Sequence, residues 1–260
     1  FLSLPMFVLI VYSFNASRLV SVWAGFSTQW YGELFRDEQI LSAVWMSLRI
    51  AFYSASMAVC LGTLCAFVIT RFKKMRGRTL LSSMITAPLV MPEVITGLSL
   101  LLLFVQMAQL IGWPADRGMA TIWIAHTTFC SAYVAVVVAA RLREVDRSIE
   151  EAAMDLGSPP VKTFFFVTLP VIAPALAAGW LLAFTLSLDD LVIASFVSGP
   201  GANTLPMVVF SSVRMGVSPK INALATLIIL TVSLATLLAW YFMRRSEAKR
   251  QSLIQQGEGA

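Results

Sequence analysis

The segment EAAMDLGSPPVKTFFFVTLP, residues 151–170, lies between two long apolar runs in a chain that carries few charges. Its first half is polar and its second half is aromatic. Two neighbouring helices can be joined by far fewer residues, since helix–helix connections usually take about 2–8 residues. The extra length predicts that this segment contacts something beyond the two helices that it joins.

The sequence around this segment is that of a membrane protein. Of the 260 residues, 58% are hydrophobic and 13% are charged, whereas soluble domains have about 25% charged residues. A spanning helix needs about 20 apolar residues. Five runs reach this length, near residues 44–70, 80–110, 119–140, 171–197 and 221–243. We therefore expect an all-α membrane domain over residues 1–243, with a polar tail over residues 244–260.

A sixth apolar run, residues 1–14, is shorter and does not begin with Met. We interpret it as the end of a first spanning helix that is truncated in this sequence, which gives six spans. A signal peptide is the alternative, but such peptides have a basic start and a small-residue cleavage site, and this run has neither.

The basic residues indicate the orientation of the chain. Of 19 basic residues, 13 follow the second, fourth and sixth spans, namely Arg71, Lys73, Lys74, Arg76, Arg78, Arg141, Arg143, Arg147, Lys162, Arg244, Arg245, Lys249 and Arg250. Because basic loops remain in the cytoplasm, both termini and the loop 141–170 are predicted to be cytoplasmic. The net charge of +5 thus reflects topology, and no nucleic-acid partner is expected.

The opening segment has the signals of two short helices. Ser148 and Glu151 have the spacing of a capping box, and Gly157 can take the left-handed conformation that ends a helix. Ser158 and Pro159 then suit the start of a second helix.

Ala152, Ala153 and Leu156 lie on one side of the first short helix. Small residues allow another backbone to come close, and a helix this short is marginal by itself. The pattern therefore predicts a docking helix. A surface helix that lies against the other loops is the alternative.

This segment resembles the EAA loop of bacterial ABC importer permeases. The resemblance rests on Glu151-Ala152-Ala153, Gly157 and Leu169-Pro170, with Val167 where Ile is usual. It covers about residues 43–240 and is nearest to the permease subunits of polyamine importers, in particular the putrescine permease. The segments that carry this second likeness are ITAPLVMPEVITGLSLLLLF (85–104), SLDDLVIASFVSGPG (187–201) and INALAT (221–226).

The resemblance implies the type I ABC importer permease fold, in the bacterial inner membrane, with the loop 141–170 as a coupling loop seated on an ATPase subunit. The implied coupling residues are Glu151, Ala152, Ala153, Asp155, Leu156 and Gly157. The implied partners are a second, different permease, two ATP-binding subunits and a periplasmic solute-binding protein. A path for putrescine, spermidine or another organic cation is implied in the same way.

The sequence also favours a separate motor. It contains no Gly-Lys pair, and so it lacks the phosphate-binding loop G-x-x-x-x-G-K-[ST]. No cofactor is expected on this chain, while ATP and Mg are expected on the partner ATPase. No catalytic motif is present, so we do not expect an enzyme.

Proline and glycine interrupt two of the predicted spans. Pro88, Pro92 and Gly97 lie in the third span, and Pro170 opens the fifth. Proline removes a helical hydrogen bond, and broken helices persist where they line a cavity or are buried in protein. We expect helix breaks here that mark the solute path, with a merely kinked packing helix as the alternative.

Only three acidic residues, Glu93, Asp189 and Asp190, lie inside the predicted spans. Such groups seldom face lipid, so they are candidates for a cation path. No in-chain basic partner is expected for them. The alternatives are a basic residue on the second permease, or capping of a helix at a break in the fifth span.

Three other functional classes remain open. The three acids could be ion sites of a secondary transporter, a gated channel would move solute down its gradient, and an ABC permease could carry a different small solute. His126, the only histidine, shares a helix face with Cys130, but two ligands do not make a zinc site. We expect His126 to be a packing or channel-facing residue, and Cys60, Cys65 and Cys130 to be packing residues.

Overall fold

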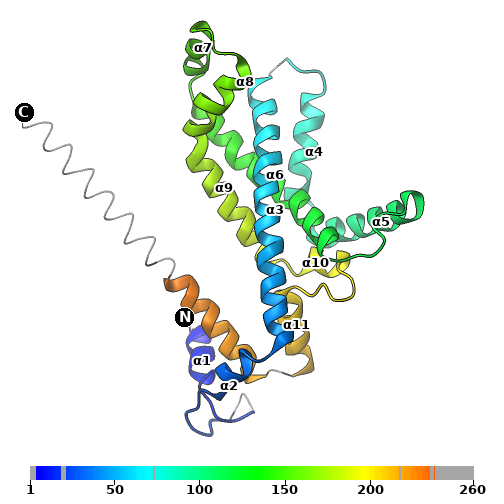
Figure 1. The fold of residues 1–260 in the computed structure, drawn as a ribbon, viewed down its shortest axis with the longest axis vertical. Helices are drawn as coiled ribbons and strands as arrows, with labels where there is room; N and C mark the ends of the chain where they lie inside the picture. Colours follow the sequence, from blue (N-terminus) through cyan, green and yellow to red (C-terminus); the bar gives the residue numbers. More distant parts are fainter. Residues whose placement is uncertain (1–3, 19–21, 73, 217, 235–236, 238–260) are drawn as a thin grey trace, which may run out of the picture. The chain divides into compact units, whose positions relative to one another are not determined.

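The computed structural model describes residues 4–18, 22–72, 74–216, 218–234 and 237 (Figure 1). Over these residues the secondary structure is helical, with one isolated bridge between Asn15 and Phe26 and no β-strand. The expectation of an all-α chain is confirmed. The predicted tail 244–260 and the end of the sixth run lie outside the described residues.

The chain forms two compact units, Ser42–Val208 and a second one drawn from Phe1–Leu41 and Val209–Ala260. The helices of the larger unit are α3 (Glu38–Arg71, which begins in the other unit), α4 (Arg78–Val90), α5 (Glu93–Ile111), α6 (Met119–Glu144), α7 (Arg147–Asp155), α8 (Pro160–Thr163), a π-helical turn η1 (Phe164–Thr168), α9 (Leu169–Asp189), α10 (Val192–Val197) and the start of α11 (Leu205–Met215).

Four helices are long and apolar enough to cross a membrane: Glu38–Arg71, Glu93–Ile111, Met119–Glu144 and the continuous helix Pro160–Asp189. They fall on four of the six predicted spans. The other two predicted spans correspond to α1 (Leu4–Tyr12) and to the helix Pro219–Leu234, which are shorter in the described residues.

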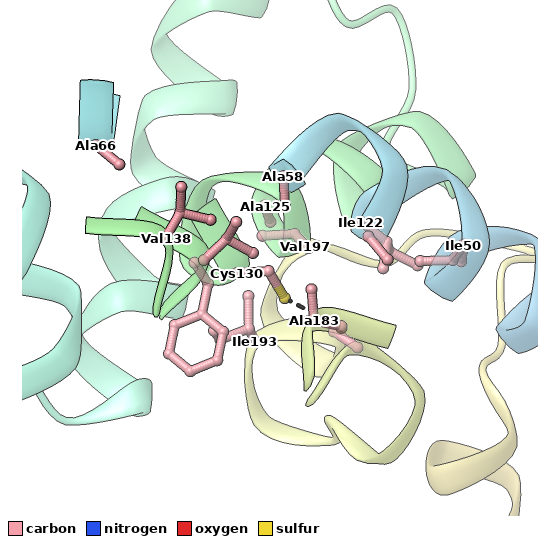
Figure 2. Close-up of a cluster of buried hydrophobic side chains, with 14 of the residues drawn as sticks. Ile50, Ala58, Ala66, Ile122, Ala125, Cys130, Val138, Ala183, Ile193 and Val197 are labelled. Atoms are coloured by element: carbon pink, nitrogen blue, oxygen red, sulfur yellow. Dashed lines mark hydrogen bonds between the residues drawn. The ribbon is translucent and has the colours of Figure 1, made fainter. Parts of the chain in front are cut away.

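The core of the larger unit is built around α6. Buried side chains of α6 meet small residues of α3 and α9 (Figure 2), so that the helices approach closely. A Cβ atom on Gly62 would lie only 2.8 Å from the Cβ of Val134. The thiol of Cys130 lies 3.5 Å from the carbonyl oxygen of Ala183, which makes Cys130 a packing residue. Small residues at such interfaces are typical of membrane helices.

Two predicted spans are interrupted. The run 80–110 is two helices, and the interruption between them falls at Met91–Pro92. The run 171–197 is also two helices, since α9 ends at Asp189 and α10 begins at Val192. Pro92 has no N–H group to offer the preceding turn, which is a physical reason for the first interruption.

The other expected breaks are wrong. Pro88 lies inside α4, and Gly97 lies inside α5, where a Cβ atom would come 2.7 Å from Cδ2 of Phe196. Gly97 therefore allows α10 to pack closely against α5. Pro170 lies in the first turn of α9, but the helix runs on without a break from Pro160 to Asp189. A π-helical turn precedes Pro170, in which the amide of Leu169 donates to the carbonyl oxygen of Phe164, and single turns of this kind occur inside α-helices.

The smaller unit contains α1, α2 (Gln29–Leu34) and the helix Pro219–Leu234. Trp30 is buried, and its Nε1 donates a hydrogen bond of 2.6 Å to the carbonyl oxygen of Asn15. The ammonium group of Lys220 lies 3.4 Å from Asp37 and 3.5 Å from Glu33.

Candidate functional sites

The segment that opened the sequence analysis forms a helix, a sharp turn and a second helix. Gly157 has φ of +88°, a conformation that glycine takes with little strain. Its amide donates to the carbonyl of Met154 at 2.9 Å, and the amide of Ser158 donates to the carbonyl of Ala153 at 3.1 Å. This pair of bonds is a Schellman motif, so the expectation that Gly157 ends the first helix is confirmed.

The start of α7 differs from the prediction. The cap is Asp146, whose carboxylate accepts the amide of Ser148 at 3.0 Å, and the expected capping box of Ser148 and Glu151 is not formed. The hydrogen bond from the Ser148 amide lowers the pKa of Asp146. Both Asp and Ser are good caps, and the structure uses the one that starts the helix earlier.

The second short helix, by contrast, starts later than expected. Pro159 occupies the cap position and Pro160 is the first helical residue of α8. The hydroxyl of the expected cap, Ser158, instead accepts a hydrogen bond of 3.1 Å from the hydroxyl of Thr163.

The predicted coupling residues lie together on an exposed surface. No residue of α7 is buried, and Leu156 is 90% exposed. Ile149 and Met154 of the same helix are also exposed. Apolar side chains gathered on an exposed surface mark interaction sites. The structure thus leaves this segment available to a partner chain.

Polar contacts that the sequence did not reveal attach α7 to the end of α3. Arg71, the last residue of α3, donates from Nη2 and Nε to Oε1 of Glu150, at 2.8 and 3.2 Å. The hydroxyl of Thr168 donates to the same oxygen at 2.9 Å. Arg147 donates to the carbonyl oxygens of Thr70 and Arg71, at 2.8 and 3.0 Å. These partners are far apart in the sequence, so no local pattern could have paired them.

A cavity of about 190 Å³ lies beside these contacts. Its lining includes Arg71, Glu150, Glu151, Met154 and Phe164. The cavity is thus lined both by residues that hold α7 on α3 and by Glu151, one of the predicted coupling residues.

The acids of the predicted cation path have different surroundings. Glu93 is exposed in the first turn of α5, and Asp189 is exposed at the end of α9. Asp190 is buried, and its carboxylate accepts the amides of Ile193 at 3.3 Å and of Ala194 at 2.8 Å. Asp190 thus caps α10, which is the alternative that the sequence had left open for a break in the fifth span.

Asp190 also has a partner within the chain, which corrects a prediction. Nε2 of His126 lies 3.0 Å from Oδ2 of Asp190, an ion-pair distance without hydrogen-bond alignment. Nδ1 of His126 is hydrogen-bonded to the hydroxyl of Ser187 at 2.7 Å. His126 is fully buried, so it is a packing residue that links α6 to α9 and α10.

A second cavity, of about 560 Å³, is lined by Trp45, Leu48, Arg49, Phe52, Tyr53, Met119 and Phe184. Aromatic faces can attract an organic cation. The face of Trp45 is already covered by the guanidinium of Arg49, whose Cζ lies 4.8 Å from the ring centroid. The positive charge of Arg49 disfavours an ammonium group at this place.

The chain matches a known protein family over most of its length. Residues 58–251 match the family described as "Binding-protein-dependent transport system inner membrane component". The chain is 67% identical to the putrescine transport system permease protein PotI of Escherichia coli K12 over 250 residues, which cover 96% of this chain and 89% of that protein. It is 40% identical to the spermidine/putrescine transport system permease protein PotC of the same strain, over 96% of this chain and 91% of PotC.

Solved structures share the fold at low sequence identity. A bacterial ABC transporter involved in the import of the acidic polysaccharide alginate superposes with a TM-score of 0.73 at 16% identity, over 93% of this chain and 91% of that chain. The MetNI methionine ABC transporter gives a TM-score of 0.63 at 16% identity, over 80% of this chain and 95% of that chain. The expected fold, that of an ABC importer permease, is confirmed.

Proposed function

The chain belongs to the family of binding-protein-dependent transport system inner membrane components, and from this premise we propose that it is the permease subunit of an ATP-driven putrescine importer. The observation that carries the proposal is the 67% identity to PotI over 96% of the chain. The family consists of transport components, so this chain is not an enzyme. It is a multi-pass protein of the inner membrane.

The proposed complex contains a second, different permease, two ATP-binding subunits that hold ATP and Mg, and a periplasmic solute-binding protein. The ATP-binding subunit docks on the exposed surface of α7, at Glu151, Ala152, Ala153, Asp155, Leu156 and Gly157. Docking of a cytoplasmic ATP-binding subunit on α7 implies that the loop 141–170 and both termini lie in the cytoplasm. It is supported by the exposed apolar side chains of α7 and by the basic residues near it.

The proposed path uses the three acids in two ways. Glu93 and Asp189 are exposed, so their carboxylates can meet the two ammonium groups of a diamine. Asp190 shapes the path by holding the start of α10, since its carboxylate is occupied by two amides and His126. An acid at a helix start and another at a helix end would let the cation shed water in steps.

The test is uptake of labelled putrescine into proteoliposomes that contain the whole complex. Uptake should require the ATP-binding subunits and ATP, whereas an ion-driven carrier or a channel would transport without them. Competition by unlabelled spermidine, compared with unlabelled putrescine, tests the choice of substrate.

Two charge-removing variants test the path itself. Glu93→Gln and Asp189→Asn should reduce uptake while the complex still assembles and keeps its basal ATPase activity. Asp116→Asn is the matched control, because Asp116 is an exposed acid outside the predicted spans. Normal uptake in both path variants would contradict the proposed role of these acids.

A further inference from the structure

The helix α7 depends on its surroundings for its position. It has nine residues and none of them is buried. Isolated helices of this length are marginal in water. A helix that receives force from a motor must nevertheless be fixed to the spans that it moves, so its attachments determine where that force goes.

Glu150 is the centre of one attachment. Its Oε1 accepts hydrogen bonds from the Arg71 side chain of α3 and from the Thr168 hydroxyl of η1. The side chains of Arg71 and Glu150 are only 10% and 12% exposed. A paired charge that is shielded from water is held more firmly than one at the open surface.

Arg147 adds contacts at the end of α3, and Arg71 extends the attachment to the end of α6. Arg147 donates to the carbonyls of Thr70 and Arg71 at the end of α3, where a cation is favoured by the helix dipole. The remaining arm of Arg71 donates to the carbonyl oxygen of Leu142, near the end of α6, at 3.1 Å. Two residues of α7 are thereby tied to α3 directly, to α6 through Arg71, and to η1 through Thr168.

We propose that Arg71, Arg147 and Glu150 form a latch that transmits displacement of α7 to the cytoplasmic ends of α3, α6 and η1. This inference rests on the proposed function and adds positioning residues to it. None of the three belongs to the surface predicted to touch the ATPase. They act through the helices that they join, so their removal should leave the motor bound and active but poorly coupled to transport.

Glu150→Gln tests the latch in the complete complex, because it keeps the size of the side chain and removes its charge. The ratio of putrescine imported to ATP hydrolysed should fall by about ten-fold, within the range usual for coupling between two sites. Co-purification of the ATPase subunit should remain as in the wild type. The coupling ratio is the decisive measurement, since a purely structural role would change the amount of complex and not the ratio.

Arg141→Gln provides the matched control. Arg141 pairs with Glu144 at 2.9 Å on the same end of α6, but these side chains are 42% and 67% exposed. Surface pairs of this kind contribute little, so the coupling ratio of this variant should equal that of the wild type.

Three outcomes would overturn the latch. The first is a wild-type coupling ratio in Glu150→Gln, and the second is an equal fall in Arg141→Gln. The third is loss of assembly in both Glu150→Gln and the double variant Arg71→Gln/Glu150→Gln, which leaves no unpaired charge and would assign the pair to folding alone. A wild-type complex that imports no putrescine would instead contradict the proposed function, whatever the variants do.

Discussion

The larger unit holds two short helices, α7 and α10, by polar contacts, and the two attachments differ in their surroundings. The side chains of His126 and Asp190, which hold the start of α10, are only 2% and 5% exposed, whereas those of Arg71 and Glu150, which hold α7, are 10% and 12% exposed and lie at the rim of the protein. Water reaches the place of a lost partner more easily at the rim than inside the protein. We therefore expect the loss of one partner to cost more stability at the start of α10 than at α7.

The largest effect is expected when the buried attachment is broken on one side. His126→Leu leaves the carboxylate of Asp190 buried without its imidazole partner, and removal of one partner of a buried ion pair costs about 3–5 kcal/mol. This cost is measured as the difference in the free energy of unfolding between the variant and the wild-type chain, both purified in detergent. Thr128→Val is the control on the same helix, because the Thr128 hydroxyl is exposed and bonds only to the carbonyl of Ile124.

A double variant sharpens this comparison. In His126→Leu/Asp190→Leu both ionisable groups are gone, and apolar replacements of a buried pair are often neutral, although the cap of α10 is lost. The double variant should therefore be more stable than His126→Leu alone. If the two are equally unstable, the buried charge of Asp190 is not the cause of the loss.

A smaller effect is expected where α10 meets α5. A Cβ atom at Gly97 would lie 2.7 Å from Cδ2 of Phe196 and 3.3 Å from Cα of Ile193. Gly97→Ala should therefore lower the unfolding free energy by about 1–3 kcal/mol, as overpacking usually does. Gly32→Ala is the matched control in α2, where a Cβ atom meets nothing within 4 Å, and it should be neutral or stabilising. Equal effects at both glycines would show that α10 is not held closely.

The sequence predicted those features that depend on local composition. The apolar runs of α3, α6 and α9 were found because a spanning helix is defined by length and hydropathy. The turn at Gly157 was found because glycine is the residue that this turn requires.

The two polar attachments were not found, and the reason is the same for both. His126 lies on α6 and Asp190 lies between α9 and α10, while Arg71 lies on α3 and Glu150 on α7. Which side chains meet depends on how the helices pack, which no local pattern contains. A lone histidine in a chain with three acids inside the predicted spans was the available signal. It was insufficient, because histidine was not counted as a possible basic partner.

The next prediction concerns the turn at Gly157, which follows α7. Gly157 has φ of +88°, and a β-branched residue in this region is strained by about 1–2 kcal/mol. Gly157→Val should disturb the end of α7 and reduce stimulation of the ATPase by loaded binding protein, together with co-purification of the ATPase subunit. Gly157→Asn should do so less, since asparagine tolerates this conformation. No atom of the described chain lies within 4 Å of the added Cβ, so equal losses in both variants would point to close contact with the partner instead of strain.

The smallest effect on stability is expected at Glu151. The cap of α7 is Asp146 and not Ser148 with Glu151, and Glu151 is exposed, so Glu151→Ala should change the unfolding free energy by no more than about 0.5 kcal/mol. The same variant should nevertheless reduce stimulation of the ATPase, because its side chain lies on the surface predicted to meet the motor. The two measurements distinguish the two short helices. Changes at α10 should lower the free energy of unfolding, whereas Glu151→Ala in α7 should lower ATPase stimulation and leave the free energy of unfolding nearly unchanged. A loss of stability in Glu151→Ala well above that limit would show that α7 is fixed by more than its rim contacts.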